Sequence, residues 1–263
     1  ITEPFTGLTM GEHAEIMAVK NNVSRARQDE LAYKSHVNAA KAQESGWLKD
    51  EIIPIWTGKD KSVFADKDNL VRSDTTVEAL AKLKPVFDRK NGTITAGNAS
   101  PLTDGASGAL LCSERYAKEN HLETLGSIVD IMTVAVDPND QLLIGPAYVI
   151  PKLLKRNNIS KDQVGVYEIH EAFAGQVLSC LDCMASEKFC REKLNMETFG
   201  EIPLEKLNIQ GSSIAIGHPF GATGARMIGN ALRIANRIGA KYAIVAVCAA
   251  GGIGMGVLLE SKV

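Results

Sequence analysis

The composition of this chain changes sharply at Thr93, and this change restricts the fold more than any other feature. Before it, residues 1–92 are polar and helix-prone, with long charged side chains around spaced apolar residues at 25–51. After it, short runs of Gly, Ala, Ile and Val alternate with longer stretches of helical period. Such alternation is typical of α/β domains, so we expect a helical region followed by an α/β sheet.

Six segments have the short apolar pattern of strands, at 106–112, 125–136, 166–170, 212–216, 242–247 and 253–260. A shorter strand is expected at 52–56, within an exposed loop that extends to residue 74. Helical spacing of apolar residues marks three stretches, at 146–157, 172–184 and 225–238. The last two strands flank the sequence CAAGG, so we expect an antiparallel pair whose glycine turn lets a ligand approach the backbone.

Charge and composition exclude several classes of protein. The 263 residues include 29 Lys and Arg and 31 Asp and Glu, so a net charge of -2 provides no basic surface for nucleic acid. No apolar run approaches the ~18 residues of a membrane span, and the first residues have no signal-peptide pattern. An odd number of cysteines, 5, favours reduced thiols. We therefore predict a soluble globular protein of a reducing compartment.

Three titratable residues stand beside glycines or prolines at the ends of expected strands: His170 in HEAFAG, His218 in GHPFGATGAR and Cys248 in CAAGG. Ligands of α/β sheets bind at strand ends, so these side chains could converge on one pocket. A cationic imidazole lowers the pKa of a neighbouring thiol. Imidazole and backbone N–H groups could polarise a thioester carbonyl while the thiol transfers a proton at the adjacent carbon. The pattern indicates acyl chemistry rather than redox chemistry.

The same residue types also have plain structural interpretations. A single cysteine in an apolar strand is usually a small buried hydrophobe. Three cysteines have a spacing that resembles a metal site, but no adjacent histidine completes a ligand set, so we predict no metal at Cys180, Cys183 and Cys190. The remaining histidines lie in polar stretches, and we expect all of them at the solvent surface: His13, His36 and His121.

Four motifs resemble the thiolase family and occur in its order. They are GTITAGNASPLTDGAS at 92–107, HEAFA at 170–174, NIQGSSIAIGHPFGATGAR at 208–226 and CAAGGIGMG at 248–256. The N-terminal region is similar to thiolases too, with LTMGEHAE, RQDELAYKSHVNAA and LKDEIIP, so the resemblance covers nearly the whole chain. HEAFA, where many thiolases have Asn-Glu-Ala-Phe, together with CAAGG resembles the thiolase subunit of the trifunctional complex of fatty-acid β-oxidation.

The resemblance implies an α/β fold of thiolase type. Its parts would be a helical loop domain at 1–92 with CoA contacts, the last strands of a truncated N-terminal half at 93–124, and a complete C-terminal half with a mixed sheet at 125–263. It also implies an acyl-CoA C-acyltransferase, which cleaves 3-ketoacyl-CoA with free CoA or runs the reverse Claisen condensation. Coenzyme A would be a substrate, and no metal or redox cofactor would be required.

The same resemblance implies the roles of individual residues. His218 would activate a nucleophilic cysteine and donate to the thioester oxygen, Cys248 would exchange the α-proton of the acetyl unit, and His170 would help to form an oxyanion hole. The CAAGG backbone would line a second one. Four further residues would contact CoA: Ser100 and Phe173 along the pantetheine arm, Arg72 against the nucleotide and Met10 in the pantetheine tunnel.

One part of the family pattern is not found, the first cysteine in a Cys-x-x-Gly turn that leads into a buried helix. We therefore expect the chain to begin inside the loop domain, to associate through unpaired strands at 93–112, and to be inactive in thiolysis alone. A non-catalytic thiolase-fold binding or assembly protein is the alternative. A ketoacyl synthase is disfavoured, because that group uses two histidines with one cysteine.

The resemblance finally implies partners and a location. Thiolases form dimers and commonly dimers of dimers, so a homo-oligomer is expected. The likeness to the trifunctional complex adds a hydratase-dehydrogenase subunit. The expected compartment is the mitochondrial matrix or the bacterial cytoplasm.

Overall fold

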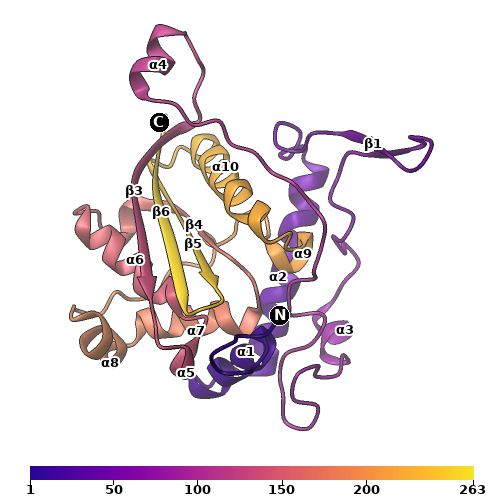
Figure 1. The fold of residues 1–263 in the computed structure, drawn as a ribbon, viewed down its shortest axis with the longest axis vertical. Coiled ribbons are helices and arrows are strands. Elements are labelled where there is room, and N and C mark those ends of the chain that lie inside the picture. The colour runs from indigo at the N-terminus through magenta and orange to yellow at the C-terminus, as the bar shows by residue number, and fades with distance from the viewer.

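A four-stranded mixed sheet forms the centre of the computed structural model, which describes residues 1–263 (Figure 1). The strand order is β3 (Gly126–Ala135), β6 (Ile253–Ser261), β5 (Tyr242–Ala249) and β4 (Val164–Ile169). β4 is parallel to β5, whereas β6 is antiparallel to both β5 and β3. Four of the expected strands and the antiparallel pair around CAAGG are thus confirmed.

Helices cover both faces of this sheet. α6 (Gly145–Arg156) packs on one face with α7 (Ala174–Ala185) beneath it, and α10 (Gly221–Ile238) packs on the other. The side chains of β5 point alternately to the two faces of the sheet. Ile244 and Ala246 belong to the core cluster of α6 and α7, whereas Ala243 and Val245 belong to that of α10. All three helices expected after Thr93 are confirmed.

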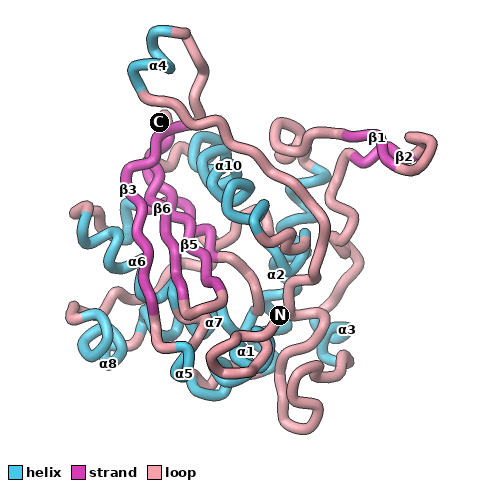
Figure 2. The backbone as a smooth tube through the Cα atoms, viewed as in Figure 1, coloured by secondary structure: helices cyan, strands magenta, loops and turns pink.

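The N-terminal region supplies two helices that pack against α7. α1 (Met10–Lys20) begins with a capping box between Thr9 and Glu12, and α2 (Arg25–Glu44) begins at the N-cap Ser24. A hairpin of β1 (Ile55–Thr57) and β2 (Val63–Ala65) projects from the body of the molecule (Figure 2). The expected strand at 52–56 therefore starts three residues later. No helix combines the length and apolar character that crossing a membrane requires.

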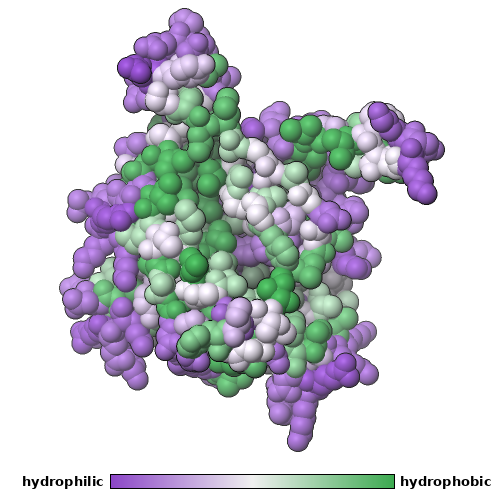
Figure 3. Space-filling view, viewed as in Figure 1, coloured by the Kyte–Doolittle hydropathy of each residue, from purple (hydrophilic) through white to green (hydrophobic).

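Short elements complete the chain. They are α3 (Val77–Ala81), α4 (Glu114–Glu119), α5 (Pro138–Gln141), a 3-10 turn (Lys161–Gln163), α8 (Glu187–Phe189), a π-helical turn (Cys190–Leu194) and α9 (Ser213–Ile216). α4 lies on a loop that extends beyond the sheet (Figure 1). Apolar side chains gather over β3 and β6 on the side that α6 does not cover (Figure 3), and they include Ile131, Ile253 and Met255.

Two expected strands are wrong. Residues 106–112 form an extended loop with Leu110 89% and Leu111 71% exposed, because no neighbouring strand is available to pair its backbone. Residues 212–216 contain the helix α9, between Gly211 and Gly217, both at positive φ. A short apolar run cannot be assigned to strand or helix by periodicity alone. The strands expected at the end of a truncated N-terminal half are replaced by isolated bridges such as Ala99 with Phe173.

Two glycines allow α6 to pack closely on β6. A Cβ added at Gly254 would lie 2.5 Å from the Cα of Gly145, and such backbone atoms cannot rotate away. We expect Gly254→Ala to displace α6 and to lower the free energy of unfolding by about 1–3 kcal/mol, measured by urea denaturation. Gly229→Ala on α10 is the control, because its Cβ would meet nothing within 4 Å and should stabilise the helix. Equal stability of the two variants would contradict this close packing.

Candidate active site

Two imidazoles meet at the carboxyl end of β4. His170 directly follows the strand, and its backbone N–H donates to the carbonyl of Ala246 on β5 at 2.9 Å. His218 lies between α9 and α10, and its backbone N–H donates to the carbonyl of Pro101 at 3.1 Å. The ring centroids are 4.3 Å apart, with 49° between the ring planes. Two residues expected to converge on one site are therefore in contact.

The backbone of the GHPFG motif explains how His218 reaches this position. Gly217 has a φ of 94°, and a Cβ there would lie 2.5 Å from the Cγ2 of Thr103, so glycine is required on both counts. Phe220 also has a positive φ, of 35°, immediately before α10 begins. The Nδ1 of His218 lies 2.8 Å from the Oγ1 of Thr223 on the first turn of α10. This contact leaves the Nε2 of His218 for another partner.

The surroundings keep both imidazoles neutral at pH 7. Burial lowers the pKa of His170 well below its usual value, and the neighbouring His218 and Arg226 lower it further. Burial, and then Arg226, lower the pKa of His218. His170 is only 1% exposed, yet neither ring nitrogen has a hydrogen-bond partner. A neutral imidazole with a buried, unpaired N–H is suited to bind a substrate oxygen.

Cys248 lies at the same edge of the sheet, two residues beyond Ala246, whose carbonyl accepts the backbone N–H of His170. It pairs with Gly254 of β6 and is 6% exposed. Its side chain belongs to the core cluster of α6 and α7, and no hydrogen bond joins its sulfur to either imidazole. Burial raises the pKa of Cys248 to about 12. The expectation of a thiol acidified by imidazole is wrong, because desolvation dominates at this position.

The glycine turn after Cys248 has the geometry expected of it. Gly251 and Gly252 have φ values of 79° and 70°, where side-chain-bearing residues are strained. A Cβ at Gly252 would lie 2.4 Å from the carbonyl oxygen of Val136. The backbone N–H of Ala250 has no acceptor and lies in an exposed residue. The turn therefore presents a free backbone donor close to the thiol.

Three of the four residues expected to contact CoA lie close to this region. Ala99 forms a bridge with Phe173, and the backbone N–H of Ser100 donates to the carbonyl of Ala172 at 2.9 Å. Met10, at the start of α1, packs against the core cluster that contains Phe173 and Cys248. Arg72 is exposed and lies beside α2, where its backbone N–H donates to the Nδ1 of His36 at 3.2 Å.

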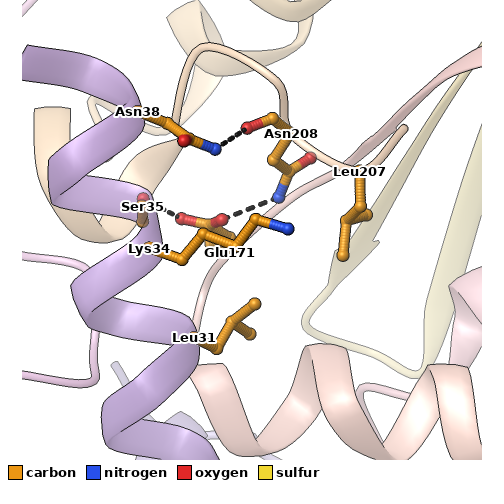
Figure 4. Close-up of a pocket in the computed structure, with 7 residues that line it drawn as sticks. All are labelled: Leu31, Lys34, Ser35, Asn38, Glu171, Leu207 and Asn208. Carbon is orange, nitrogen blue, oxygen red and sulfur yellow. Dashed lines mark hydrogen bonds between the residues drawn. The ribbon is translucent and has the colours of Figure 1, made fainter. Parts of the chain in front are cut away.

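The sequence did not reveal the polar network that holds HEAFA in place (Figure 4). The fully buried carboxylate of Glu171 accepts from the Oγ of Ser35 at 2.6 Å and from the Nδ2 of Asn208 at 2.7 Å. Asn208 also exchanges two hydrogen bonds of 2.9 Å with the backbone of Ile169. The network fixes the residues on both sides of His170. The one sequence signal for this network was Glu171, the charged residue directly after His170.

Neither of two cavities near α2 is formed by the imidazoles. The cavity drawn in Figure 4 has a volume of about 10 Å³, so it holds at most one water and is structural. A cleft of about 410 Å³ lies between α2, α7 and residues 201–204, with Leu31, Leu178 and Leu181 among its lining. None of the seven residues expected in the site lines either cavity.

Two of the histidines expected at the surface are buried. His13 is 2% exposed, and its Nε2 lies 2.7 Å from the Oγ1 of Thr6. His36 is 6% exposed and accepts the backbone N–H of Arg72. The expectation was wrong because the polar helices α1 and α2 bury one face against loops of the same region. His121 is exposed, as expected.

Family models match both parts of the chain. The model described as "Thiolase, N-terminal domain" matches residues 1–115, and the model described as "Thiolase, C-terminal domain" matches residues 122–261. The chain belongs to the thiolase family.

Individual relatives agree with this assignment. The chain is 45% identical to a "Probable 3-ketoacyl-CoA thiolase" of Caenorhabditis elegans, over 99% of this chain and 58% of the relative. It is 43% identical to a "3-ketoacyl-CoA thiolase" of Photobacterium profundum, over 100% of this chain and 60% of the relative. The chain thus spans 58% to 60% of the length of these relatives.

Solved structures share the fold. The Bacillus anthracis acetyl-CoA acetyltransferase superposes with a TM-score of 0.87 at 38% identity, covering 99% of this chain and 62% of that one. Human mitochondrial 3-ketoacyl-CoA thiolase in complex with CoA superposes with a TM-score of 0.83 at 31% identity, covering 100% of this chain and 61% of that one. The thiolase fold expected from the motifs is thereby confirmed.

Proposed function

We propose that the protein is a 3-ketoacyl-CoA thiolase, an acyl-CoA C-acyltransferase of fatty-acid β-oxidation. The observation that carries this proposal is the contact of His170 with His218, 4.3 Å apart at the buried end of β4 with neither nitrogen of His170 paired. The relatives named 3-ketoacyl-CoA thiolase support it. The human structure in complex with CoA supports coenzyme A as the substrate.

In this mechanism the imidazole pair binds the thioester oxygen. Nε2 of His218 and a ring N–H of His170 donate to that oxygen, whose negative charge grows as the α-carbon loses its proton. Because both imidazoles are neutral, they donate without first losing or gaining a proton. The Ala250 N–H is the donor of the second oxyanion hole.

Cys248 transfers the α-proton. In condensation its thiolate takes the proton from the acetyl α-carbon, and that carbon attacks the carbonyl carbon of a second acyl thioester, whose carbon–sulfur bond breaks to release a thiolate. In thiolysis an attacking thiolate forms a carbon–sulfur bond to the 3-keto carbon, the carbon–carbon bond breaks, and the Cys248 thiol returns the proton to the released α-carbon. Because burial raises the pKa of Cys248 to about 12, its thiolate is strongly basic but is only a small fraction of the thiol near neutral pH.

The pantetheine arm and the nucleotide take the places that the family motifs indicate. Phe173 and Met10 pack along the arm. Phe173 belongs to the core cluster that contains Cys248, and Met10 packs against that cluster. Ser100, one residue beyond the bridge to Phe173, contacts the same arm. Arg72 is exposed and offers its guanidinium to the phosphates of the nucleotide.

The whole protein acts as a homo-oligomer in this proposal. Exposed apolar side chains over β3 and β6, including Ile131 and Met255, support association with further polypeptide. A hydratase-dehydrogenase subunit is the proposed partner, because HEAFA with CAAGG resembles the thiolase of the trifunctional complex. The proposed location is the mitochondrial matrix or the bacterial cytoplasm.

CoA binding and α-proton exchange test the function together. We expect CoA binding by calorimetry, and transfer of deuterium from D2O into the acetyl group of acetyl-CoA by NMR. His218→Ala should slow that transfer by about 10²–10³-fold, because one oxyanion donor is lost, with CoA binding retained. CoA binding without deuterium transfer in the wild-type protein would favour a non-catalytic binding protein. Absence of both would overturn the proposal.

A further inference from the structure

Glu3 is a buried carboxylate that the proposed mechanism does not use. It is 4% exposed, and its Oε2 accepts a hydrogen bond from the backbone N–H of Gly251 at 2.6 Å. Its other oxygen, Oε1, accepts the backbone N–H of Phe5 at 3.3 Å. Gly251 belongs to the turn that follows Cys248, so a residue near the start of the sequence reaches the proposed catalytic turn.

The Glu3 side chain is held in place independently of that turn. Its backbone N–H donates to the carbonyl of Leu8 at 2.8 Å, and its carbonyl accepts from Gly7 at 2.9 Å. The N–H of Met10 donates to the carbonyl of Ile1 at 3.2 Å and joins this loop to α1. Residues 1–9 thus form a closed turn on a helix with a capping box, and the carboxylate is pre-positioned.

The proposed catalytic turn is also held by Val136. The N–H of Val136 donates to the carbonyl of Gly252 at 2.8 Å, where the close approach allows no side chain at Gly252. Gly251 and Gly252 are therefore each held by one contact from outside the turn. Ala249 and Ala250 lie between them and Cys248, and the N–H of Ala250 has no acceptor within the protein.

We propose that Glu3 is a positioning residue that fixes the orientation of the Cys248 turn through the N–H of Gly251. A carboxylate is the strongest acceptor available to a backbone N–H, and the Gly251 N–H is thereby removed from competition for a substrate oxygen. The N–H groups of Ala250 and Gly252 are left as the free donors of the turn. The catalytic consequence rests on the proposed function, but the positioning itself is measured without turnover.

Two measurements on three variants test this role. We expect Glu3→Ala to accelerate solvent exchange of the Gly251 amide by at least about tenfold in NMR. Iodoacetamide labelling, read by mass spectrometry of peptides, should become faster at Cys248 and remain unchanged at the fully buried Cys180. Glu3→Gln keeps an oxygen acceptor without charge and should give intermediate exchange. Glu44→Ala, which removes an exposed acid on α2, should change neither readout.

Unchanged exchange of Gly251 in Glu3→Ala would overturn the proposal. If Cys180 and Cys248 both label faster in Glu3→Ala, that variant has loosened the core, and Glu3→Gln becomes the deciding variant. Faster exchange of the Gly251 amide in Glu3→Gln, with Cys180 labelled at the wild-type rate, supports the positioning role. Wild-type exchange of the Gly251 amide in Glu3→Gln overturns it. These outcomes do not depend on deuterium transfer to acetyl-CoA. The proposed function and the role of Glu3 can therefore fail separately.

Discussion

Replacing Cys248 with alanine is expected to slow α-proton exchange of acetyl-CoA by about 10²–10⁴-fold and to leave CoA binding nearly unchanged. The thiol is the group that receives the proton, and alanine fills most of its buried space without accepting one. Deuterium incorporation followed by NMR measures the rate, and calorimetry measures binding. Cys112→Ala is the matched control, because Cys112 is an exposed thiol on the loop before α4.

The pH profile gives this prediction a second, independent readout. Because the pKa of Cys248 is raised to about 12, the thiolate fraction rises about tenfold per pH unit through neutrality. The exchange rate of the wild-type protein should follow that slope, and the residual rate of Cys248→Ala should not. A flat wild-type profile, or an equal loss in Cys112→Ala, would show that Cys248 is not the base.

The parts of the fold that the sequence predicts best are those with long or paired patterns. The strands around CAAGG are marked by two apolar runs joined by a glycine turn, and α10 by an apolar stripe of four turns. Residues 212–216 failed because five apolar or small residues fit either element, and the positive φ of Gly211 and Gly217 was not visible in the pattern. Residues 106–112 failed because a strand needs a neighbour, which local sequence does not report.

The site was predictable to the extent that strand ends determine it. His170 follows β4 as expected, whereas His218 follows the helix α9 and not the expected strand, and the two ring centroids lie 4.3 Å apart. The pKa of Cys248 was not predictable, because it depends on side chains that α6 and α7 pack around the sulfur. The contacts of Ser35 with Glu171 and of Glu3 with Gly251 join residues 136 and 248 positions apart, and no motif spacing reports such contacts.

Glu168 is a buried carboxyl group whose protonation affects both the stability of the fold and the charge near the imidazole pair. It lies two residues before His170 on β4, is fully buried, and neither carboxyl oxygen has a hydrogen-bond partner. Burial raises the pKa of Glu168 to about 8, with Arg226 opposing and Glu171 and Glu51 reinforcing the rise. Below that pH the carboxyl is neutral, which leaves Arg226 as the charge that lowers the pKa of both imidazoles.

Glu168→Gln should therefore change how stability depends on pH. In the unfolded chain a Glu carboxyl has a pKa of about 4.3, so between that value and about 8 folding takes up a proton. The stabilisation that comes from the raised pKa of Glu168 is fully present below pH 4 to 5, and the wild-type free energy of unfolding falls as pH rises toward 8. Glutamine removes this loss, so from pH 5 to pH 8 the variant should gain at least about 1.4 kcal/mol relative to wild type in urea denaturation. The control Glu44→Gln should show the same pH dependence of the free energy of unfolding as the wild type. If Glu168→Gln also showed the wild-type pH dependence, Glu168 would be ionised in the folded protein. Its charge would then offset that of Arg226 beside the imidazoles.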